Sequence, residues 1–326
     1  MAPISHKLDA DAVDERHSML ADLVEQEVLR GGKMSRERLA TWVKKADAIR
    51  LLRSAFRTED TTESSDGVEL DEDDRADGTA PGPMSAAGEA ARRVFEQLEE
   101  RCRCLGSLYP FSLTAGGELQ RNGNTSSAAY ELLLSMSIAH RYGIEVGGVK
   151  VDQVFERIVA MCISQMGFVV EHFGTAAGAR GSIVDRVKRA GNSLKLRMDW
   201  QGNAEVFRKM ANDGGIDTIG RLGAGDERPG DLLLLAQTTV ARSADWNKKA
   251  GEASFSALRF VFPYYRMVAA LAVPYHVAAD RLLELSRLCE VIVLDRLRLV
   301  RLFGAQLPSE SHKLCEAVAS VEFEWS

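Results

Sequence analysis

The sequence lacks an apolar run of the roughly 18 residues that a membrane-spanning helix requires. The nearest candidate, residues 261–279, is interrupted by Arg266, His276 and two prolines. The N-terminus, MAPISHKLDADAVDE, has no hydrophobic stretch typical of a secretory signal. Cysteine is scarce, and an odd count of five argues against a framework of disulfides. We therefore expect a cytoplasmic protein with reduced thiols and no membrane contact.

The signatures of several common enzyme classes are also missing. The sequence has no glycine-rich Walker loop, no His-Glu-x-x-His pair and no Gly-x-Ser-x-Gly turn. Its six histidines are scattered, and Cys102-x-Cys104 has no further cysteine or histidine at zinc-ligand spacing. These absences argue against a histidine-based metal enzyme in particular.

The composition is that of an ordinary globular protein, with 326 residues, 45% hydrophobic and 27% charged. This length favours about two domains. The net charge of −6 comes from one segment, because residues 58–83 hold ten acids and one base. The remainder holds 40 bases and 37 acids. The body of the protein is thus mildly basic, and nucleic acid stays open as a partner.

Composition and hydrophobic periodicity divide the chain into five parts. Residues 1–57 form a helical N-terminal region, and residues 58–85 form an acidic linker with too few large apolar groups to fold. The alternative role for this linker is a strip that mimics DNA. Residues 86–148 are predicted to be a small, mostly helical domain, residues 149–304 a larger domain, and residues 305–326 a C-terminal tail.

The larger domain alternates between helical and strand patterns. Helices are predicted at 151–166, 248–267, 276–287 and 295–303, and strands at 168–172, 216–220, 232–240, 268–273 and 290–294. The strand at 232–240 is almost continuously apolar, which is typical of burial on both faces. The pattern predicts an α/β fold, a mixed sheet flanked by helices and preceded by a mostly helical region.

Three polar residues of this domain fit one kind of chemistry. Glu156 lies on the first helix, Asp217 ends the glycine-rich stretch 212–217, and Gln237 ends the apolar strand after four leucines. A buried amide at that position needs a hydrogen-bond partner or an ion. Mg²⁺ prefers hard oxygen ligands and keeps several waters, so a carboxylate and an oxygen on adjacent strands are enough to hold it. Such an ion polarises a phosphodiester and lowers the pKa of an attacking water.

The order of these motifs over residues 149–304 resembles the Mrr-like restriction endonuclease branch of the PD-(D/E)xK nuclease superfamily. The resemblance implies a restriction-endonuclease-like sheet and a Mg²⁺- or Mn²⁺-dependent endonuclease. Asp217 would be the central metal ligand, Gln237 would occupy the family's Glu/Gln position, and the carbonyl of Thr238 would be a further ligand. Glu156 would be the carboxylate of the first helix.

The sequence departs from the family at the motif lysine, which is replaced by Thr239. A positive charge is expected there to stabilise the charge that develops on the phosphate. One hypothesis is that Lys249, or else Lys248, supplies this charge from the helix after Trp246. The alternative is a catalytically inactive module that binds nucleic acid or a partner protein.

A cluster of basic residues lies between the first two predicted strands. Phosphate contacts of such residues give affinity that does not depend on base sequence. We therefore expect a DNA endonuclease of a restriction or anti-phage defence system, with DNA as partner and a homodimer or a partner subunit as further possibilities. A solvated helix face is the other interpretation of the cluster, which comprises Arg180, Arg186, Lys188, Arg189, Lys195 and Arg197.

Overall fold

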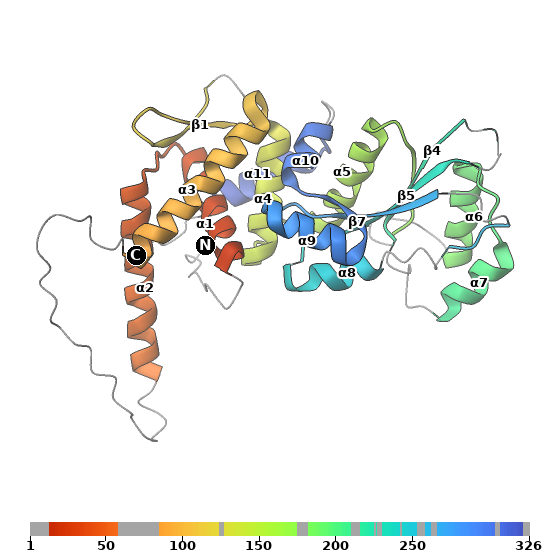
Figure 1. Ribbon diagram of the computed structural model, residues 1–326, viewed down its shortest axis with the longest axis horizontal. Helices are drawn as coiled ribbons and strands as arrows, with labels where there is room; N and C mark the ends of the chain where they lie inside the picture. Colours follow the sequence, from red (N-terminus) through yellow and green to blue (C-terminus); the bar gives the residue numbers. More distant parts are fainter. Residues whose placement is uncertain are drawn as a thin grey trace, which may run out of the picture.

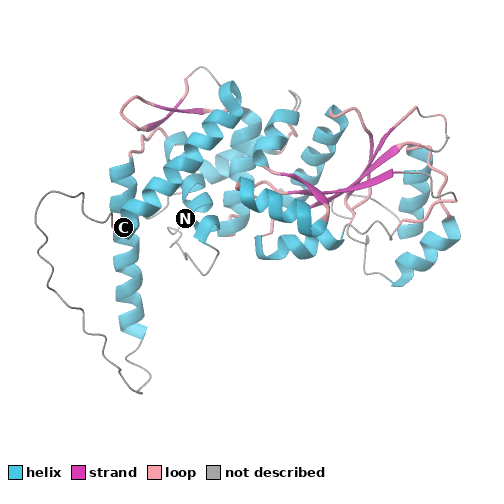
Figure 2. Cartoon of the chain, viewed as in Figure 1, coloured by secondary structure: helices cyan, strands magenta, loops and turns pink. Residues whose placement is uncertain are grey.

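Most of the helices, with a small two-stranded hairpin, form one end of the molecule, the helical end, and the five-stranded sheet with its flanking helices forms the other, the sheet end (Figure 2). The computed structural model describes residues 13–57, 85–123, 127–174, 182–209, 216–224, 226, 230–241, 243–252, 258–261, 266–303 and 307–321. The predicted acidic linker therefore falls almost entirely outside the described residues. Among the described helices, none is both long and apolar enough to cross a membrane.

The helical end is built from α1 (Val13–Leu29), α2 (Arg36–Arg57), α3 (Ala86–Leu105) and α4 (Ala128–Tyr142). A small hairpin of β1 (Phe111–Leu113) and β2 (Leu119–Arg121) connects α3 to α4 through a short 3-10 turn, η2 (Gly106–Leu108). Serine side chains begin two of these helices, since the Ser85 Oγ accepts from Gly88 N–H and the Ser127 Oγ accepts from Tyr130 N–H. The predicted N-terminal helices are thus confirmed.

The C-terminal segment returns to this helical end. It contains α11 (Ser311–Ala319), which packs against α4 and buries Leu314 and Val318 in the same core (Figure 1). The predicted tail therefore includes a helix that closes the helical end of the molecule.

The sheet end begins with α5 (Val151–Gln165) and β3 (Val169–His172). The chain continues through α6 (Ile183–Ser193), α7 (Trp200–Lys209), β4 (Thr218–Leu222), β5 (Leu232–Thr238), η3 (Ser243–Asp245), α8 (Trp246–Glu252), β6 (Arg266–Ala272), α9 (Ala279–Cys289), β7 (Val291–Leu294) and α10 (Arg296–Leu302). The strand order is β3-β4-β5-β6-β7, with antiparallel pairing up to β5 and parallel pairing from β5 to β7. The predicted mixed α/β sheet is confirmed.

The two faces of the sheet are covered by different helices. Leu234 and Ala236 of β5 pack with α5 and α10, in a core that continues into the helical end. Leu233 and Leu235 point the other way, toward α6. A side-chain carbon on Gly220 would come within 3.0 Å of Ile163 and 3.1 Å of Phe168, so this glycine allows α5 to lie close to β4. Burial on both faces explains the apolar sequence of β5.

The predicted helix at 248–267 is confirmed only over residues 248–252. The helix α8 ends at Glu252, the described residues 258–261 are irregular, and β6 begins at Arg266. Phe260 forms an isolated bridge with Met198. The sequence from Phe260 to Tyr265 is rich in aromatic residues and contains Pro263, which favours extended backbone over helix.

A network of buried charges joins the helical end to the sheet end. The Asp22 carboxylate of α1 accepts hydrogen bonds from Arg101 of α3 at 2.8 Å and from Arg296 of α10 at 2.7 and 2.8 Å. Glu25 pairs with the same Arg101 at 2.9 Å and accepts from the Tyr130 hydroxyl. Burial opposes ionisation of Asp22, but Arg296 and Arg101 hold its pKa well below the usual value.

His276 lies beside this network, on the segment that joins β6 to α9. Its side chain is buried, and its backbone carbonyl accepts a hydrogen bond from the Ser18 hydroxyl at 3.2 Å. Burial, together with the nearby Arg101 and Arg296, lowers its pKa well below 6.5, while Asp22 opposes that shift. The Glu100 carboxylate lies 3.9 Å from its Nε2. The folded protein therefore keeps this imidazole neutral at mildly acidic pH.

This burial predicts a loss of stability in acid. The unfolded chain binds a proton at His276 below its usual pKa of 6.5, whereas the folded chain does not. Between about pH 7.5 and 5.5 His276 should thus lower the free energy of unfolding by about 1.4 kcal/mol. Urea unfolding at both pH values should show a smaller loss for His276→Gln than for the wild type. His312→Gln, at an exposed histidine, should show the same loss between the two pH values as the wild type. Equal pH dependence in all three proteins would contradict the assignment.

Candidate functional site

Asp217 is fixed where β3, β4 and β5 meet. Its backbone N–H donates to Ala236 O at 2.9 Å, and its carbonyl accepts from the N–H groups of Phe173 at 2.8 Å and Gly174 at 2.9 Å. Its Oδ2 accepts from both the N–H and the hydroxyl of Thr238, at 2.7 and 2.8 Å. The carboxylate is therefore held at the end of β5 and is almost completely buried.

Gly174 makes room for this carboxylate. A side-chain carbon at residue 174 would lie 2.8 Å from Asp217 Oδ1 and 3.1 Å from its Cα. Such contacts are too close for any residue larger than glycine unless Asp217 moves. The sequence pattern indicated only the end of a strand here, so the role of Gly174 in seating Asp217 was missed.

Gln237 lies next to Asp217 on the neighbouring strand. Thr218 pairs with Ala236, and extending that register by one residue places Asp217 opposite Gln237. Ile219 and Leu235 show that this face of the sheet is the one covered by α6. Gln237 is buried, and within the described part of the chain its Oε1 has no hydrogen-bond partner. The structure thus brings together two of the residues that the sequence singled out.

Glu156 is carried by α5, which covers the face of the sheet opposite to Gln237. The apolar side of α5 packs with Leu234 and Ala236, whose side chains alternate with that of Gln237. Glu156 lies nine residues before the end of α5, about 13.5 Å along the helix. His172, at the end of β3, lies about 13 Å along the strand from the same turn. His172 pairs with Thr218, and buried Glu156 is carried by the helix that covers the face of the sheet opposite to Gln237.

Two threonines lie next to Asp217 and Gln237 in the sequence. The side chain of Thr218 points toward α5, and its buried Oγ1 has no hydrogen-bond partner among the described residues. The hydroxyl of Thr238 donates to Asp217 Oδ2. Thr218 was not predicted as a site residue, since a threonine within a strand carries no distinguishing signal in the sequence.

Thr239, at the position where a lysine was expected, is held by hydrogen bonds within the fold. Thr239 donates its N–H to Ala272 O at 3.0 Å, and its hydroxyl accepts from Ala241 N–H at 3.0 Å. On α8, Lys249 forms an ion pair with Glu252 at 2.7 Å, and both side chains are about one-third exposed, at 34% and 32%. Lys248 is exposed. Replacement of the missing lysine by either residue therefore stays a prediction.

The helix α8 nevertheless covers the face of the sheet on which Gln237 lies. Trp246 and Ala250 pack with Leu271 of β6, and Leu271 pairs with Gln237 in parallel register. Register partners point to the same side of a sheet. Lys249 and Gln237 are thus carried by elements on one face, whereas Glu156 is carried on the other.

The predicted basic cluster is divided by the structure. Arg186 is buried, and its guanidinium donates to Phe173 O at 2.8 Å. Arg189 pairs with Glu171 at 3.0 Å and fastens α6 to β3. Lys188, Lys195 and Arg197 are exposed. Arg180 lies outside the described residues. Part of the cluster therefore fixes α6, and part faces solvent beside the site.

The oxygen donors match the chemistry expected of a magnesium site. Asp217 supplies a carboxylate and Gln237 a buried amide oxygen, which are hard ligands of the type that Mg²⁺ binds. Among the described residues, no three acidic, histidine or cysteine side chains cluster closely enough to form a metal site by themselves. A magnesium ion here would rely on one carboxylate, neutral oxygens and water.

Comparisons with protein-family models, curated proteins and solved structures gave no significant match to this chain. The functional interpretation therefore depends on the geometry of the residues themselves and on the resemblance of their motifs.

The packing of Gly174 predicts a steric test of the site. Gly174→Ala should lower the free energy of unfolding by about 1–3 kcal/mol, because the new methyl group overlaps Asp217. Gly147→Ala is the matched control, since a methyl group there meets no atom within 4 Å. Urea unfolding of both variants measures the difference. A Gly174→Ala protein as stable as the wild type would contradict the described seating of Asp217.

Proposed function

We propose that the chain is a metal-dependent DNA endonuclease that hydrolyses phosphodiester bonds. The observation that carries this proposal is the pairing of Asp217 with Gln237 at one end of adjacent antiparallel strands. The order α5, β3, β4, β5, α8, β6 supports the restriction-endonuclease-like fold that the motifs resemble, with α6 and α7 inserted between β3 and β4. Strands β3, β4 and β5 pair antiparallel, and β6 is parallel to β5. A role in a restriction or anti-phage defence system is proposed from the resemblance alone, and a cytoplasmic location from the sequence of the N-terminus and the cysteine count.

The ligand set would comprise Asp217, Gln237 and the carbonyl of Thr238. The unpartnered Oε1 of Gln237 supports this assignment, since a buried amide oxygen is rarely left without a partner. When bound, Mg²⁺ or Mn²⁺ supplies the Lewis acid that activates water and polarises the phosphate. The hydrogen bonds from Thr238 to Asp217 fix the carboxylate before substrate arrives.

Hydrolysis requires that a water oxygen bond to phosphorus and that the bond from phosphorus to the leaving sugar oxygen break. The leaving oxygen takes up a proton, and negative charge grows on the phosphate in the transition state. Lys249 is our first candidate to stabilise this charge, and Lys248 the second, because α8 covers the face on which Gln237 lies. The ion pair of Lys249 with Glu252 is exposed enough to exchange for a phosphate.

DNA would be positioned mainly by contacts to its backbone. Lys188, Lys195 and Arg197 are exposed on α6 and on the segment after it, and α6 covers the face of the sheet that holds Gln237. Charges of this kind give salt-dependent affinity without base specificity. Cleavage of both strands by enzymes with one site per chain favours a homodimer or a partner subunit.

A second candidate function is a nuclease-fold module that binds nucleic acid or a partner protein without cleavage. The observation that favours it is Thr239, which is bonded into the fold, together with the ion pair of Lys249. Calorimetric titration with Mn²⁺ separates the two candidates, since the inactive module should not bind the ion at Asp217.

Asp217→Asn tests the proposed active site. Cleavage of plasmid DNA with Mg²⁺ or Mn²⁺ should fall by about 10²- to 10³-fold, as expected when one preorganised group is lost. The variant keeps the shape of the side chain, so thermal unfolding should show a folded protein. Asp152→Asn, at an exposed carboxylate of α5, is the control and should cleave normally. A folded Asp217→Asn protein that cleaves like the wild type would refute the site.

Lys249→Ala tests the source of the missing positive charge. Cleavage should fall by about a hundredfold, while DNA binding changes little because a single phosphate contact contributes little to the total affinity. Lys248→Ala measures the second candidate in the same assay, and Lys313→Ala, at an exposed lysine of α11, is the control. Equal losses of binding and cleavage would show that Lys249 only grips the DNA backbone. Full activity in both variants would show that neither lysine supplies the missing positive charge.

A further inference from the structure

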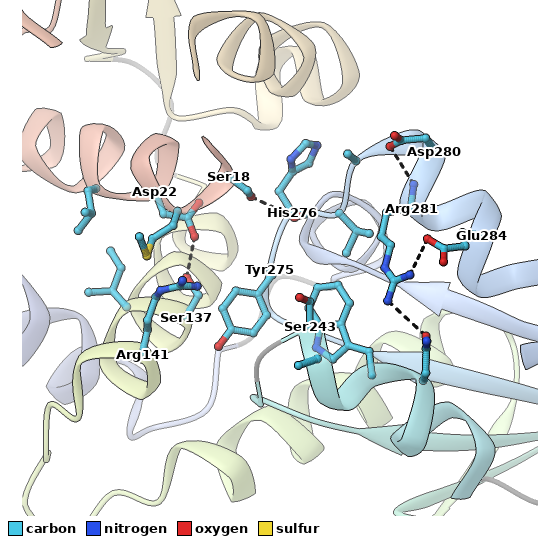
Figure 3. A pocket seen from close by; sticks show the side chains of 18 of the residues that line it. Ser18, Asp22, Ser137, Arg141, Ser243, Tyr275, His276, Asp280, Arg281 and Glu284 are labelled. Carbon is cyan, nitrogen blue, oxygen red and sulfur yellow. Dashed lines mark hydrogen bonds and ion pairs between the residues drawn. The ribbon is translucent and has the colours of Figure 1, made fainter. Parts of the chain in front are cut away.

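Trp200, the first residue of α7, exposes aromatic surface at the sheet end. It is 39% exposed, and α7 lies beside α6 at the outer end of the sheet (Figure 1). The aromatic residues Trp246 and Tyr275, which line a cavity of about 570 Å³ among α1, α4, α8 and α9, are only 4% and 9% exposed (Figure 3). Trp200 is therefore far more accessible to a flat ligand than these two side chains are.

The ring of Trp200 is seated on a glycine of α6. A side-chain carbon on Gly191 would lie 2.6 Å from Cη2 of Trp200, so the glycine leaves the space that the ring occupies. Glycine is unfavourable in the interior of a helix, and this contact gives it a structural purpose in α6. The six-membered end of the indole is thus fixed against α6, while the residue as a whole stays accessible.

The first turn of α7 is held by hydrogen bonds to Arg259. Buried Asn203 donates its side-chain amide to Arg259 O at 2.6 Å and accepts from Arg259 N–H at 2.9 Å. The N–H of Asp199 donates to the same carbonyl at 3.0 Å, and its carboxylate caps α7 by accepting from Gly202 N–H at 2.9 Å. Trp200 is therefore fixed before a ligand arrives, which limits the conformational entropy lost on binding.

Exposed basic side chains flank this ring. Lys188 precedes Gly191 by one helical turn on α6, so the two positions are neighbours on one face of that helix. Arg259 lies beside the first turn of α7, since a side-chain carbon on Gly202 would lie 3.4 Å from Arg259 Cβ. Lys188 and Arg259 are both exposed. Phosphates next to a base that is stacked on the ring would meet these two charges.

The exposed carboxylates of α6 and α7 are turned away from the ring or already bound. Asp185, three residues before Lys188, accepts from the N–H and the hydroxyl of Ser182 at 2.9 and 2.7 Å. Glu205 is exposed but lies about 140° around α7 from Trp200. The charge beside the ring is therefore mainly positive.

The segment 258–261 adds apolar area to the same surface. Phe260 forms a bridge with Met198, and both pack in the core beneath α6. Arg259 and Val261 alternate with Phe260 and point outward, and Val261 is 55% exposed. The surface therefore combines cations with aromatic and aliphatic area.

We propose that the surface formed by Trp200, Lys188, Arg259 and Val261 binds single-stranded nucleic acid, with one base stacked on the Trp200 ring. Bases within a duplex are stacked on each other, so an exposed ring favours unpaired nucleotides, and every base offers it a flat face. The same chemistry has two sources, single-stranded DNA and single-stranded RNA. The inference goes beyond cleavage of DNA and rests on the proposed function only in taking nucleic acid as the partner.

Fluorescence anisotropy of the full chain with labelled strands of about 12 nucleotides, in EDTA so that no metal is bound, tests the assignment. Trp200→Ala should weaken binding of a thymidine strand by about tenfold, as expected when one stacked base is lost. Trp200→Leu should show the same loss, because leucine still packs on Gly191 but has no ring face. An abasic strand, which has the phosphates without the bases, should bind both variants like the wild type. Leu288→Ala, at an exposed leucine of α9, is the control and should change nothing.

A uridine strand of the same length distinguishes the two sources. Tighter binding of the thymidine strand would identify DNA as the ligand, tighter binding of the uridine strand would identify RNA, and equal binding would identify both. A fully paired DNA duplex should bind the wild type and Trp200→Ala equally.

The proposal is overturned if Trp200→Ala and Trp200→Leu, shown to be folded by thermal unfolding, bind the thymidine and uridine strands as tightly as the wild type. It is also overturned if they lose affinity for the abasic strand to the same extent, since the ring would then act without a base. Failure of the proposed function gives a different result, because a wild type that binds these strands through Trp200 but leaves plasmid DNA intact with Mg²⁺ would refute only the cleavage.

Discussion

The buried carboxylate of Asp22 is the contact on which the union of the two ends of the molecule depends. It receives hydrogen bonds from Arg101 on α3 and from Arg296 on α10, which are both fully buried. Removing one member of such a group leaves an unpaired charge in a medium that solvates it poorly. The free energy of unfolding typically falls by about 3–5 kcal/mol. Because the partners come from positions far apart in the sequence, the arrangement α1–α3–α10 is specified by charge as well as by apolar packing.

Arg296 also connects this network of buried charges to the carboxyl ends of the parallel strands. Arg296 donates its backbone N–H to Tyr275 O at 2.9 Å and its side-chain Nε to Pro274 O at 2.9 Å. The Tyr275 hydroxyl in turn donates to Val240 O, just after Thr239. A continuous series of hydrogen bonds thus leads from α1, through the segment after β6, to the loop that follows the candidate site. The helical end therefore helps to fix the backbone next to Gln237.

The sequence predicted the sheet better than it predicted these connections. Alternating and continuous apolar patterns report burial, so β3, β4, β5, β6 and β7 were each found close to their observed limits. The sequence placed Asp217 and Gln237 on adjacent strands, and the antiparallel register of β4 and β5 sets them opposite each other. The partners of Asp22 could not be predicted in this way, because Arg101 and Arg296 have no periodic signal and are brought to it only by tertiary packing. The helix expected at 248–267 extends too far toward β6, because apolar aromatic residues suit a strand as well as a helix.

Because side chains alternate along β5, the residues of the proposed site are carried on two different faces of the sheet. Gln237 and Thr239 alternate with Thr238, so a lysine at residue 239 would have stood on the face of Gln237, away from α5. Glu156 is carried on the other face, the one covered by α5. A substitute cation must come from an element on the face of Gln237, and both α6 and α8 are on that face. On α6 the buried Arg186 is engaged with Phe173 O. The partly exposed Lys249 of α8 pairs, among the described residues, with Glu252 of its own helix, and for that reason it is the more suitable candidate.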